Sequence, residues 1–479
     1  MEQSENNNSR RKFIKSSVMG GALLGISSFP TQAESIGGAG TSLLKMPSGQ
    51  KTAIGMAAPP IPTVRVGFIG VGNRGWYAAR RYTFLKGVEI KAICDINEAR
   101  IDLTQKMLKE KGIIDVASYT GGPDAWKKMV ERNDLDLIYI ATPWLLHTPM
   151  AVYSMNCGKH AALEVPAAVT IEQCWDLVNT SEKTRRHCTM LENCCYDEFE
   201  MATLNMAQQG IFGEIYHGEG AYIHSLNELC FGKKEDDTGK DYYEDQWLLK
   251  YNTIHTGSTY PTHGIGPIAQ IMNINRGDKF EFLTSTSSNQ YGITKYAQEK
   301  YGIDSAQAKQ KYMLGDINTT VIKTHKGKTM MIQHDVTSPR PYSRIHLISG
   351  TKGIAQKWPV QGIALEPDYH QYLKKEEMDE LLVKYQHPQI KKFGEIFREI
   401  SNKDKGSHGI MDYLMEYRLI YCLRNGLPLD IDVYDAASWS SIIELSEKSV
   451  LSESKKIDIP DFTRGEWNKR QQTEFAEKS

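Results

Sequence analysis

The feature that most constrains the fold is a glycine-rich turn between two short apolar segments. Residues 64–69 (VRVGFI) run directly into Gly70, Gly72 and Gly75, which are spaced as GxGxxG, and a second apolar segment follows at 88–94. This order predicts a strand, a tight turn, a helix and a second, parallel strand. Gly70 permits the turn, Gly72 lets the backbone approach a pyrophosphate, and Gly75 lets helix and strand pack closely. The segment therefore predicts a dinucleotide site.

An acidic residue at the end of the second strand narrows the choice of dinucleotide. Asp95 follows Gly75 by twenty residues. A carboxylate at this place can accept hydrogen bonds from ribose hydroxyls and would repel a 2′-phosphate, so the sequence favours NAD over NADP. The alternative is a purely structural turn, which is disfavoured because strand, motif, helix, strand and acid occur in the expected order.

Alternating strand and helix patterns continue after this unit. Apolar runs at 135–141, at 160–163 and near 188–191 alternate with helical patterns such as 97–111 and 147–157. Such alternation predicts right-handed crossovers and a parallel sheet. The first domain is therefore expected to be a Rossmann domain that ends near Asn193.

Beyond Asn193 the pattern changes to antiparallel strands and returning helices. A Lys-Gly-Lys turn between 319–324 and 329–336 predicts a hairpin, and the polar region 286–311 reads as a solvated helix. We predict an α/β fold, with an N-terminal Rossmann domain and a C-terminal α+β domain on a largely antiparallel open sheet. The predicted domains are 63–193 and 194–479, and the other predicted elements of the second domain are helices at 196–209, 387–401, 408–425 and 433–452, a strand at 214–224, and a hairpin of 344–348 with 354–357.

The N-terminus resembles an export signal. Arg10 and Arg11 precede a mildly apolar segment at 18–29 and a small-residue cleavage candidate at Ala33. This resembles a twin-arginine signal, which would let the protein cross the membrane folded around its cofactor; the alternative is a basic disordered tail. The apolar segment is too short and glycine-rich for a convincing membrane span. We predict a signal peptide at 1–33, a mobile linker at 34–62, and export by the twin-arginine machinery to the periplasm or the medium.

Charge and cysteine content exclude some classes of partner. The 57 basic and 58 acidic residues nearly balance, which argues against nucleic acid and against a strongly polyanionic substrate. The eight cysteines form no CxxC pair, so free buried thiols are predicted. His408 and Asp412 could share a helix face as metal ligands, but without a third ligand a structural or substrate-side hydrogen bond is favoured. We predict no metal site and a small neutral ligand, and the sequence is compatible with a homo-oligomer.

Further segments, taken with the glycine turn and Asp95, carry a resemblance to a known family. They are ATPWLLH at 141–147, Glu164-Val165-Pro166, YPTHGIGP at 260–267, HGIMDYLM at 408–415 and DVYDAASWSSIIELSEKSV at 432–450. Together they resemble the Gfo/Idh/MocA oxidoreductase superfamily and, within it, the bacterial α-N-acetylgalactosaminidases of glycoside hydrolase family 109. The resemblance extends from about residue 60 to the C-terminus.

One departure from ordinary superfamily dehydrogenases bears on the reaction. Those proteins usually read Glu-Lys-Pro where this chain has valine, Val165, which can neither accept nor donate a proton. The alternative is a neutral change in a residue that lines the cofactor. The resemblance implies a retaining glycosidase that hydrolyses terminal α-linked N-acetylgalactosamine with tightly bound, recycled NAD. Two other functions stay open: a net sugar dehydrogenase, and a noncatalytic sugar or NAD sensor.

The implied reaction is a cycle of oxidation, elimination, addition and reduction. Oxidation of the sugar at C3 makes the C2 proton acidic, and its removal expels the leaving group from C1. Water then adds at C1, C2 is reprotonated, and C3 is reduced again. This differs from the usual pair of catalytic carboxylates.

The resemblance also implies which residues serve this cycle. His263 suits proton transfer at C3 or C1, Tyr196 is a candidate C2 base, and Tyr342 could assist it. Glu164 either orients a sugar hydroxyl, acts as an acid, or supports the cofactor. Tyr242, Tyr243 and Trp247 either line the sugar cleft or pack in the core. Cofactor contacts are implied at Asn73, Arg74, Asp95, Trp144, Leu145, Leu146, His147, Glu164, Val165 and Asn193, beside the three glycines, and sugar contacts at Tyr222, Tyr260, Pro261, Thr262, His263 and Tyr342.

Overall fold

The structure is a computed structural model that describes residues 50–479 except 234–241, 369, 404–407, 471 and 479. The predicted signal peptide and the first part of the predicted linker lie outside the described residues. Within the described part of the chain, every helix is too short or too polar to cross a lipid bilayer.

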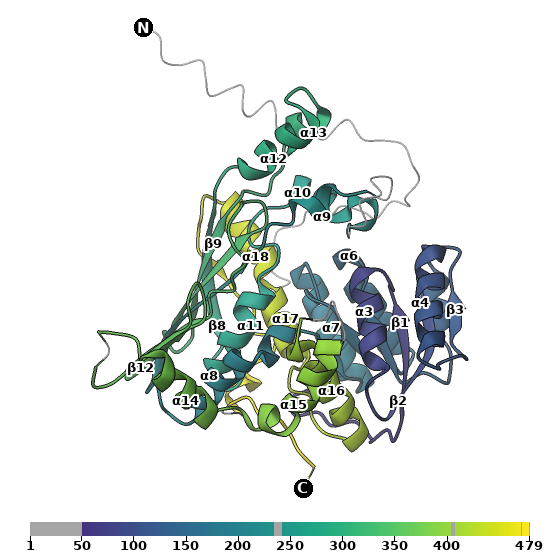
Figure 1. Cartoon of the computed structure of the whole chain (residues 1–479), viewed down its shortest axis with the longest axis horizontal. Coiled ribbons are helices and arrows are strands. Elements are labelled where there is room, and N and C mark those ends of the chain that lie inside the picture. Colours follow the sequence, from purple (N-terminus) through teal and green to yellow (C-terminus); the bar gives the residue numbers. More distant parts are fainter. Residues whose placement is uncertain (1–49, 234–241, 369, 404–407, 471, 479) are drawn as a thin grey trace. The chain divides into compact units, whose positions relative to one another are not determined.

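The first domain is built on a six-stranded parallel sheet with the strand order β3-β2-β1-β4-β5-β6 (Figure 1). The order reverses between β1 and β4, and in such sheets ligands bind outside the carboxyl ends of the strands at this reversal. The predicted Rossmann architecture is confirmed. Its strands are β1 (Val64–Ile69), β2 (Val88–Cys94), β3 (Ala117–Tyr119), β4 (Leu137–Ile140), β5 (His160–Leu163) and β6 (Cys188–Met190), and its helices are α3 (Asn73–Tyr82), α4 (Glu98–Glu110), α5 (Ala125–Val130), α6 (Trp144–Asn156) and α7 (Ile171–Thr184).

The second domain is built on an eight-stranded sheet with the order β13-β12-β11-β7-β10-β9-β8-β14. Its pairings are antiparallel except for the parallel pair β7 and β10, which confirms the largely antiparallel prediction. The strands are β7 (Ile215–Ile223), β8 (Phe280–Ser287), β9 (Asn318–Thr324), β10 (Thr329–Asp335), β11 (Leu347–Gly350), β12 (Gly353–Gln356), β13 (Gly362–Leu365) and β14 (Ile457–Asp458).

Helices cover one face of this sheet, and α11 (Thr262–Ile271) lies unusually close to β7 (Figure 1). Glycines on both elements permit this approach, because a Cβ at Gly220 would lie 2.1 Å from the carbonyl oxygen of Gly264. The contact brings the start of α11 beside the end of β7. The other helices of this domain are η1 (Asn193–Tyr196), α8 (Glu198–Gln208), α9 (Asn227–Phe231), η3 (Glu244–Gln246), α10 (Trp247–Ile254), α12 (Gly292–Tyr301), α13 (Ala306–Lys309), α14 (Lys375–Lys384), α15 (Pro388–Lys403), α16 (Ile410–Asn425), α17 (Val433–Ser440), α18 (Ile442–Leu451) and η4 (Glu466–Asn468).

Three predicted elements differ in the structure. The region 286–311 is not one helix: β8 runs into it, α12 ends at Gly302 with φ +90°, and Ser305 caps α13. The helix predicted at 433–452 is divided into α17 and α18. Strand β11 begins later than predicted, because Ile345 and His346 have φ of 57° and 50°, which a strand does not allow.

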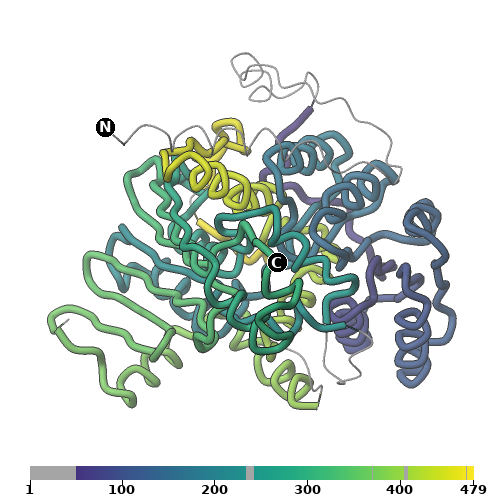
Figure 2. The backbone as a smooth tube through the Cα atoms, turned by 90° about the horizontal axis from the view of Figure 1, so that it is seen from above, coloured from purple at the N-terminus to yellow at the C-terminus, as the bar shows by residue number. Residues whose placement is uncertain are grey.

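The C-terminal helices return to the first domain. Helix α16 packs against β1, and Arg81 of α3 forms buried ion pairs with Glu416 (2.6 Å) and Asp412 (3.3 Å) of α16. Figure 2 shows the yellow-green C-terminal part of the tube running alongside the N-terminal domain. Within the predicted linker, Ala53 is buried and its amide donates to Tyr434 Oη (2.8 Å).

Candidate active site

A cavity of about 600 Å³ lies at the carboxyl ends of the parallel strands and is lined by both domains. It gathers most of the residues implied from sequence, together with the aromatic residues whose place the sequence left open. From the first domain these are Gly70, Gly72, Asn73, Arg74, Asp95, Trp144, Leu146, His147, Glu164, Val165 and Asn193, and from the second Tyr222, Tyr242, Tyr243, Trp247, Tyr260 and His263.

The glycine turn has the shape that a pyrophosphate requires. Gly70 has φ +83°, and a Cβ there would lie 2.6 Å from the carbonyl oxygen of Ala141. A Cβ at Gly75 would lie 1.9 Å from the carbonyl oxygen of Gly70, whereas a Cβ at Gly72 would meet nothing within 4 Å. Gly72 therefore presents bare backbone to the cavity, immediately before the N-terminus of α3, where free amides favour an anion.

Asp95 is fixed by the backbone around it. Its carboxylate accepts hydrogen bonds from the amides of Val71 (2.8 Å) and Asn97 (2.9 Å). Burial raises the pKa of Asp95, although these amides and Arg100 act in the opposite direction. The carboxylate is thus held toward the cavity at the end of β2, where it can receive ribose hydroxyls.

Replacing Asp95 with alanine should weaken retention of NAD. Charged hydrogen bonds are worth about 1.5–3 kcal/mol, so we expect dissociation to be about 10- to 100-fold faster. Bound nucleotide per subunit after gel filtration is the measurement. Asp95→Asn removes the charge but keeps one of the two acceptor oxygens, so it helps to separate loss of charge from collapse of the turn. Parent-like retention by Asp95→Ala would show that this carboxylate does not bind the cofactor.

Glu164 and Asp412 are joined by Arg74. The guanidinium donates to Glu164 Oε1 (2.6 Å) and to both oxygens of Asp412 (3.0 and 3.1 Å), and Tyr139 Oη donates to Glu164 Oε1 (2.6 Å). Burial alone would raise the pKa of Asp412, but Arg74 and Arg81 hold it well below its usual range. His408 Nδ1 lies 3.2 Å from Asp412, so this pair belongs to a network of charges between the domains.

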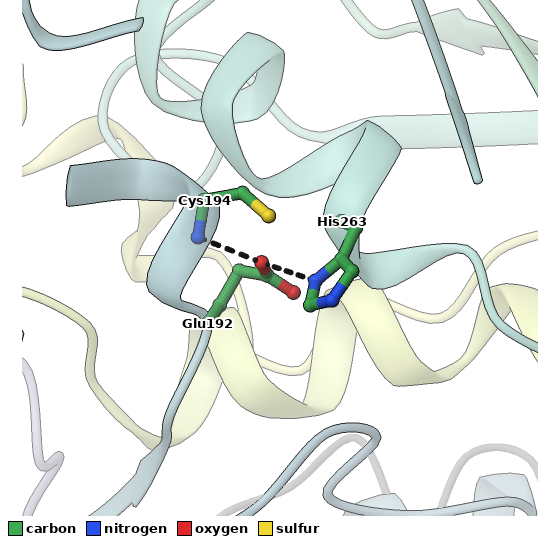
Figure 3. A group of neighbouring side chains, drawn as sticks. All are labelled: Glu192, Cys194 and His263. Carbon is green, nitrogen blue, oxygen red and sulfur yellow. Dashed lines mark hydrogen bonds and ion pairs between the residues drawn. The ribbon is translucent and has the colours of Figure 1, made fainter. Parts of the chain in front are cut away.

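His263 forms a buried pair with Glu192, a residue that sequence reasoning missed. The imidazole Nδ1 donates to Glu192 Oε1 (2.7 Å), and Figure 3 shows the two side chains facing one another. Burial would raise the pKa of Glu192, but the charge and hydrogen bond of His263 lower it. On the other side of the ring, Nε2 lies 3.4 Å from Tyr260 Oη. The only available signal was position, since Glu192 follows β6 at the carboxyl edge of the sheet.

Cys194 lies beside this pair. Among the described residues, Glu192, Cys194 and His263 bring three potential metal-ligand atoms within 4.8 Å of one another. The carboxylate already accepts hydrogen bonds from His263 Nδ1 and from the Cys194 amide (3.2 Å), and burial raises the pKa of the Cys194 thiol. We therefore interpret the group as a carboxylate that orients an imidazole.

All eight cysteines have free thiols, and seven of them are buried.

Aromatic rings form the wall opposite the glycine turn. Tyr260 stacks on Trp144 with ring centroids 5.5 Å apart, and Tyr222 lies 4.6 Å from Tyr260. Tyr222 Oη is 3.1 Å from His224 Nδ1, and the ring of His224 contacts that of Tyr342. Such rings offer both an apolar face and a polar edge, which suits a sugar.

Some implied residues lie outside the cavity. Tyr196 is buried elsewhere, where its hydroxyl donates to Asp430 (3.2 Å) and burial raises its pKa well above the usual range, so we no longer propose it as a base. Tyr342 does not line the cavity; its hydroxyl accepts from Arg344 (3.3 Å), and burial raises its pKa to about 12. The other implied residues that do not line it are Gly75, Leu145, Pro261 and Thr262.

His147 lines the cavity, but both of its ring nitrogens face carbonyl oxygens, at 2.7 Å from Pro166 and 2.6 Å from Thr142. It therefore shapes the backbone of the wall.

Comparison with known proteins identifies the family. A profile described as "Glycosyl hydrolase 109, C-terminal domain" matches residues 196–469, and one described as "Oxidoreductase family, NAD-binding Rossmann fold" matches 64–191. The chain belongs to glycoside hydrolase family 109. A Bacteroides fragilis protein named α-N-acetylgalactosaminidase is 56% identical over 426 residues, which cover 89% of this chain and 98% of the relative. A Porphyromonas gingivalis family 109 protein is 45% identical over 438 residues, covering 88% and 89%.

Solved structures share the fold of this family 109 protein at low sequence identity. An inositol dehydrogenase homologue from Azotobacter vinelandii, complexed with NADH and myo-inositol, has a TM-score of 0.58 and 14% identity, with 84% of this chain and 99% of that chain covered. Myo-inositol dehydrogenase from Lactobacillus casei has a TM-score of 0.55 and 16% identity, with 84% and 99% covered. The likeness supports the two-domain fold.

Proposed function

We propose that this protein is a retaining glycosidase that cleaves terminal α-linked N-acetylgalactosamine, with an NAD that stays bound and is recycled. The observation that carries the proposal is the meeting of three features in one cavity: the glycine turn with Asp95, the His263 and Glu192 pair, and Val165 in place of a proton-transferring lysine. The name of the Bacteroides fragilis relative supplies the substrate class.

The residues present fit NAD. Gly72 and the first turn of α3 would hold the pyrophosphate, and Asp95 the adenosine ribose. Bound NAD supplies reversible hydride transfer at C3 of the sugar. The first domain thus holds the cofactor, while α11 and β7 bring polar side chains of the second domain into the same cavity.

The side chains then have separate tasks. His263, oriented by Glu192, takes the proton of the sugar hydroxyl at C3 as that carbon is oxidised and returns it at the end. Glu164 is ion-paired to Arg74, so it serves as an acceptor for a sugar hydroxyl better than as an acid. Tyr222, Tyr260 and Trp144 present their faces to the C–H groups of the ring.

Proton NMR of the reaction in heavy water tests this proposal. An aryl α-N-acetylgalactosaminide is incubated with the purified protein and no added NAD. Reversible removal of the C2 proton predicts solvent deuterium at C2 of the released sugar, because the proton that returns comes from solvent. Release of the sugar without deuterium would contradict the cycle. Sustained NADH production would instead identify a net dehydrogenase, and absence of both products would favour a sensor.

We also propose export by the twin-arginine route. The paired Arg10 and Arg11, the apolar segment and the candidate cleavage site near Ala33 support it. A cofactor that must be loaded before export would also explain why such a protein leaves the cell folded.

A further inference from the structure

A segment of the second domain crosses the adenosine end of the cofactor cleft. Residues 242–247, which we call the strap, contribute Tyr242, Glu244 and Trp247 to the wall of the cavity that Asp95 also lines. Asp95 marks the adenosine end, because a carboxylate after the second strand of a Rossmann unit lies at the adenosine ribose. The strap belongs to the second domain, so it is placed to touch the nucleotide from outside the Rossmann domain.

The strap is tied to the cofactor-binding elements at several independent points. Asn73 Nδ2 donates to the backbone carbonyl of Tyr242 (3.2 Å), and the guanidinium of Arg100 lies 5.7 Å from the centre of the Tyr242 ring. Asn97 Nδ2 donates to Glu244 (3.3 Å). At its far end, the ring of Trp247 packs edge-on against Trp144, with centroids 5.1 Å apart, so the strap is joined to the starts of α3, α4 and α6.

The backbone of the strap has an unusual form. Asp245 and Gln246 follow one another with φ of 53° and 51°, in the left-handed region that side chains other than glycine disfavour. A backbone in this region is strained and persists only where the surrounding contacts hold it. Strained residues of this kind are often found where a protein clamps a ligand. Gln246 Nε2 donates to the carbonyl of Phe231 (3.0 Å), which anchors the turn to its own domain.

The charges around the expected ribose position favour NAD over NADP. Glu244 brings a second carboxylate toward Asp95, and it is one of the causes of the raised pKa of Asp95. Arg100 is a nearby cation, and its guanidinium lies 5.7 Å from the centre of the Tyr242 ring. Two carboxylates near the expected ribose position favour a free ribose hydroxyl over a phosphate.

We propose that the 242–247 strap retains NAD in the closed cleft and that Glu244 acts with Asp95 to exclude NADP. This rests on the proposed function only in that the cofactor must be NAD and must stay bound. A recycled cofactor gains from a slow exit, because no step of the cycle requires its release.

A label-chase experiment on the purified holoenzyme tests both parts. The protein is mixed with equal concentrations of isotope-labelled NAD⁺ and NADP⁺, and the bound nucleotides are measured by mass spectrometry over time. Tyr242→Ala should exchange its nucleotide at least about fivefold faster than the parent, because the ring over the cleft and its contact with Arg100 are lost. Tyr242→Phe keeps the ring and should exchange at the parent rate.

Glu244→Gln tests the charge. We expect the ratio of bound NADP⁺ to bound NAD⁺ to rise about fivefold, because one repulsive charge is removed. Glu299→Gln, which removes an exposed carboxylate from α12, should leave the ratio unchanged. If Tyr242→Ala does not fold, Glu244→Gln carries the test alone. If a folded Tyr242→Ala exchanges nucleotide at the parent rate, the strap does not retain NAD. If Glu244→Gln keeps the parent ratio of bound nucleotides, Glu244 does not exclude NADP. These readouts count bound nucleotide, so they fail independently of whether the sugar is cleaved.

Discussion

The protein with His263 replaced by asparagine is expected to lose about 10²- to 10⁴-fold in kcat/KM, the usual contribution of a positioned acid or base. Asparagine is chosen because its amide can still donate to Glu192, which is fully buried and pairs with His263 Nδ1. Alanine would leave that carboxylate without its partner, at a cost of about 3–5 kcal/mol in stability. NAD content should be unchanged, since His263 belongs neither to the glycine turn nor to the strap. Activity within tenfold of the parent would show that His263 is not an acid or base in the reaction.

Glu192→Gln separates the orienting carboxylate from the imidazole itself. The variant would no longer supply the charged hydrogen bond that orients the imidazole, so kcat should fall about 10- to 100-fold. Glu182→Gln is the matched control. Glu182 is a buried carboxylate with its own partners, Tyr434 and Arg464, and does not line the cavity. A purely structural role of Glu192 would lower stability in both variants and leave the kcat values of both alike.

The first domain could be predicted from sequence because its signals are local. The glycine turn, Asp95 and the alternation of apolar runs each reflect a constraint that acts within a few residues or within one strand and helix. The cavity confirms that these segments meet, because the carboxyl ends of β1, β2, β4 and β5 lie along one edge. The resemblance to a family added the residues of the second domain, which no local pattern could have placed.

The missed features depend on contacts between distant parts of the chain. Glu192 and His263 are 71 residues apart, and α11 comes close to Glu192 at Gly266, where a Cβ would lie 2.9 Å from Glu192 Cγ. The strap is separated from Asn73 by 169 residues at the Tyr242 contact. Tyr196 shows the converse, since Asn193, three residues before it, lines the cavity while the Tyr196 hydroxyl donates to Asp430.

The free energy of unfolding is expected to fall steeply below about pH 6.5. Burial lowers the pKa of seven histidines, and in five of them it falls far: to about 3 for His160, His334 and His346 and to about 4 for His187 and His387. In the unfolded chain each imidazole has its ordinary pKa near ~6.5. Below that pH it therefore binds a proton that the same imidazole does not bind in the folded protein. Their contribution is therefore complete above about pH 6.5 and is lost as pH falls toward the folded pKa values.

Two buried carboxyl groups oppose this trend. Burial raises the pKa of Glu200 and Glu416 to about 7, so between about pH 4.5 and 7 the folded state binds these two protons and the unfolded state does not. Each group changes stability by about 1.4 kcal/mol per pH unit, and five imidazoles against two carboxyls leave roughly 4 kcal/mol per unit. Proteins usually have a free energy of unfolding of about 5–15 kcal/mol, so a shift from about pH 6.5 to 5 should remove much of this free energy.

Urea unfolding at several pH values between about 7.5 and 5 measures this slope. His387→Gln should reduce the slope by about 1.4 kcal/mol per pH unit, because one buried imidazole no longer titrates on unfolding. His387 does not line the cavity, so the variant leaves the proposed site intact. His325→Gln is the control, since it removes an imidazole whose side chain is 51% exposed and leaves the buried histidines in place. A free energy of unfolding that is flat over this range would mean that these imidazoles accept protons within the fold, which would require water or a partner to reach positions where the structure has them enclosed.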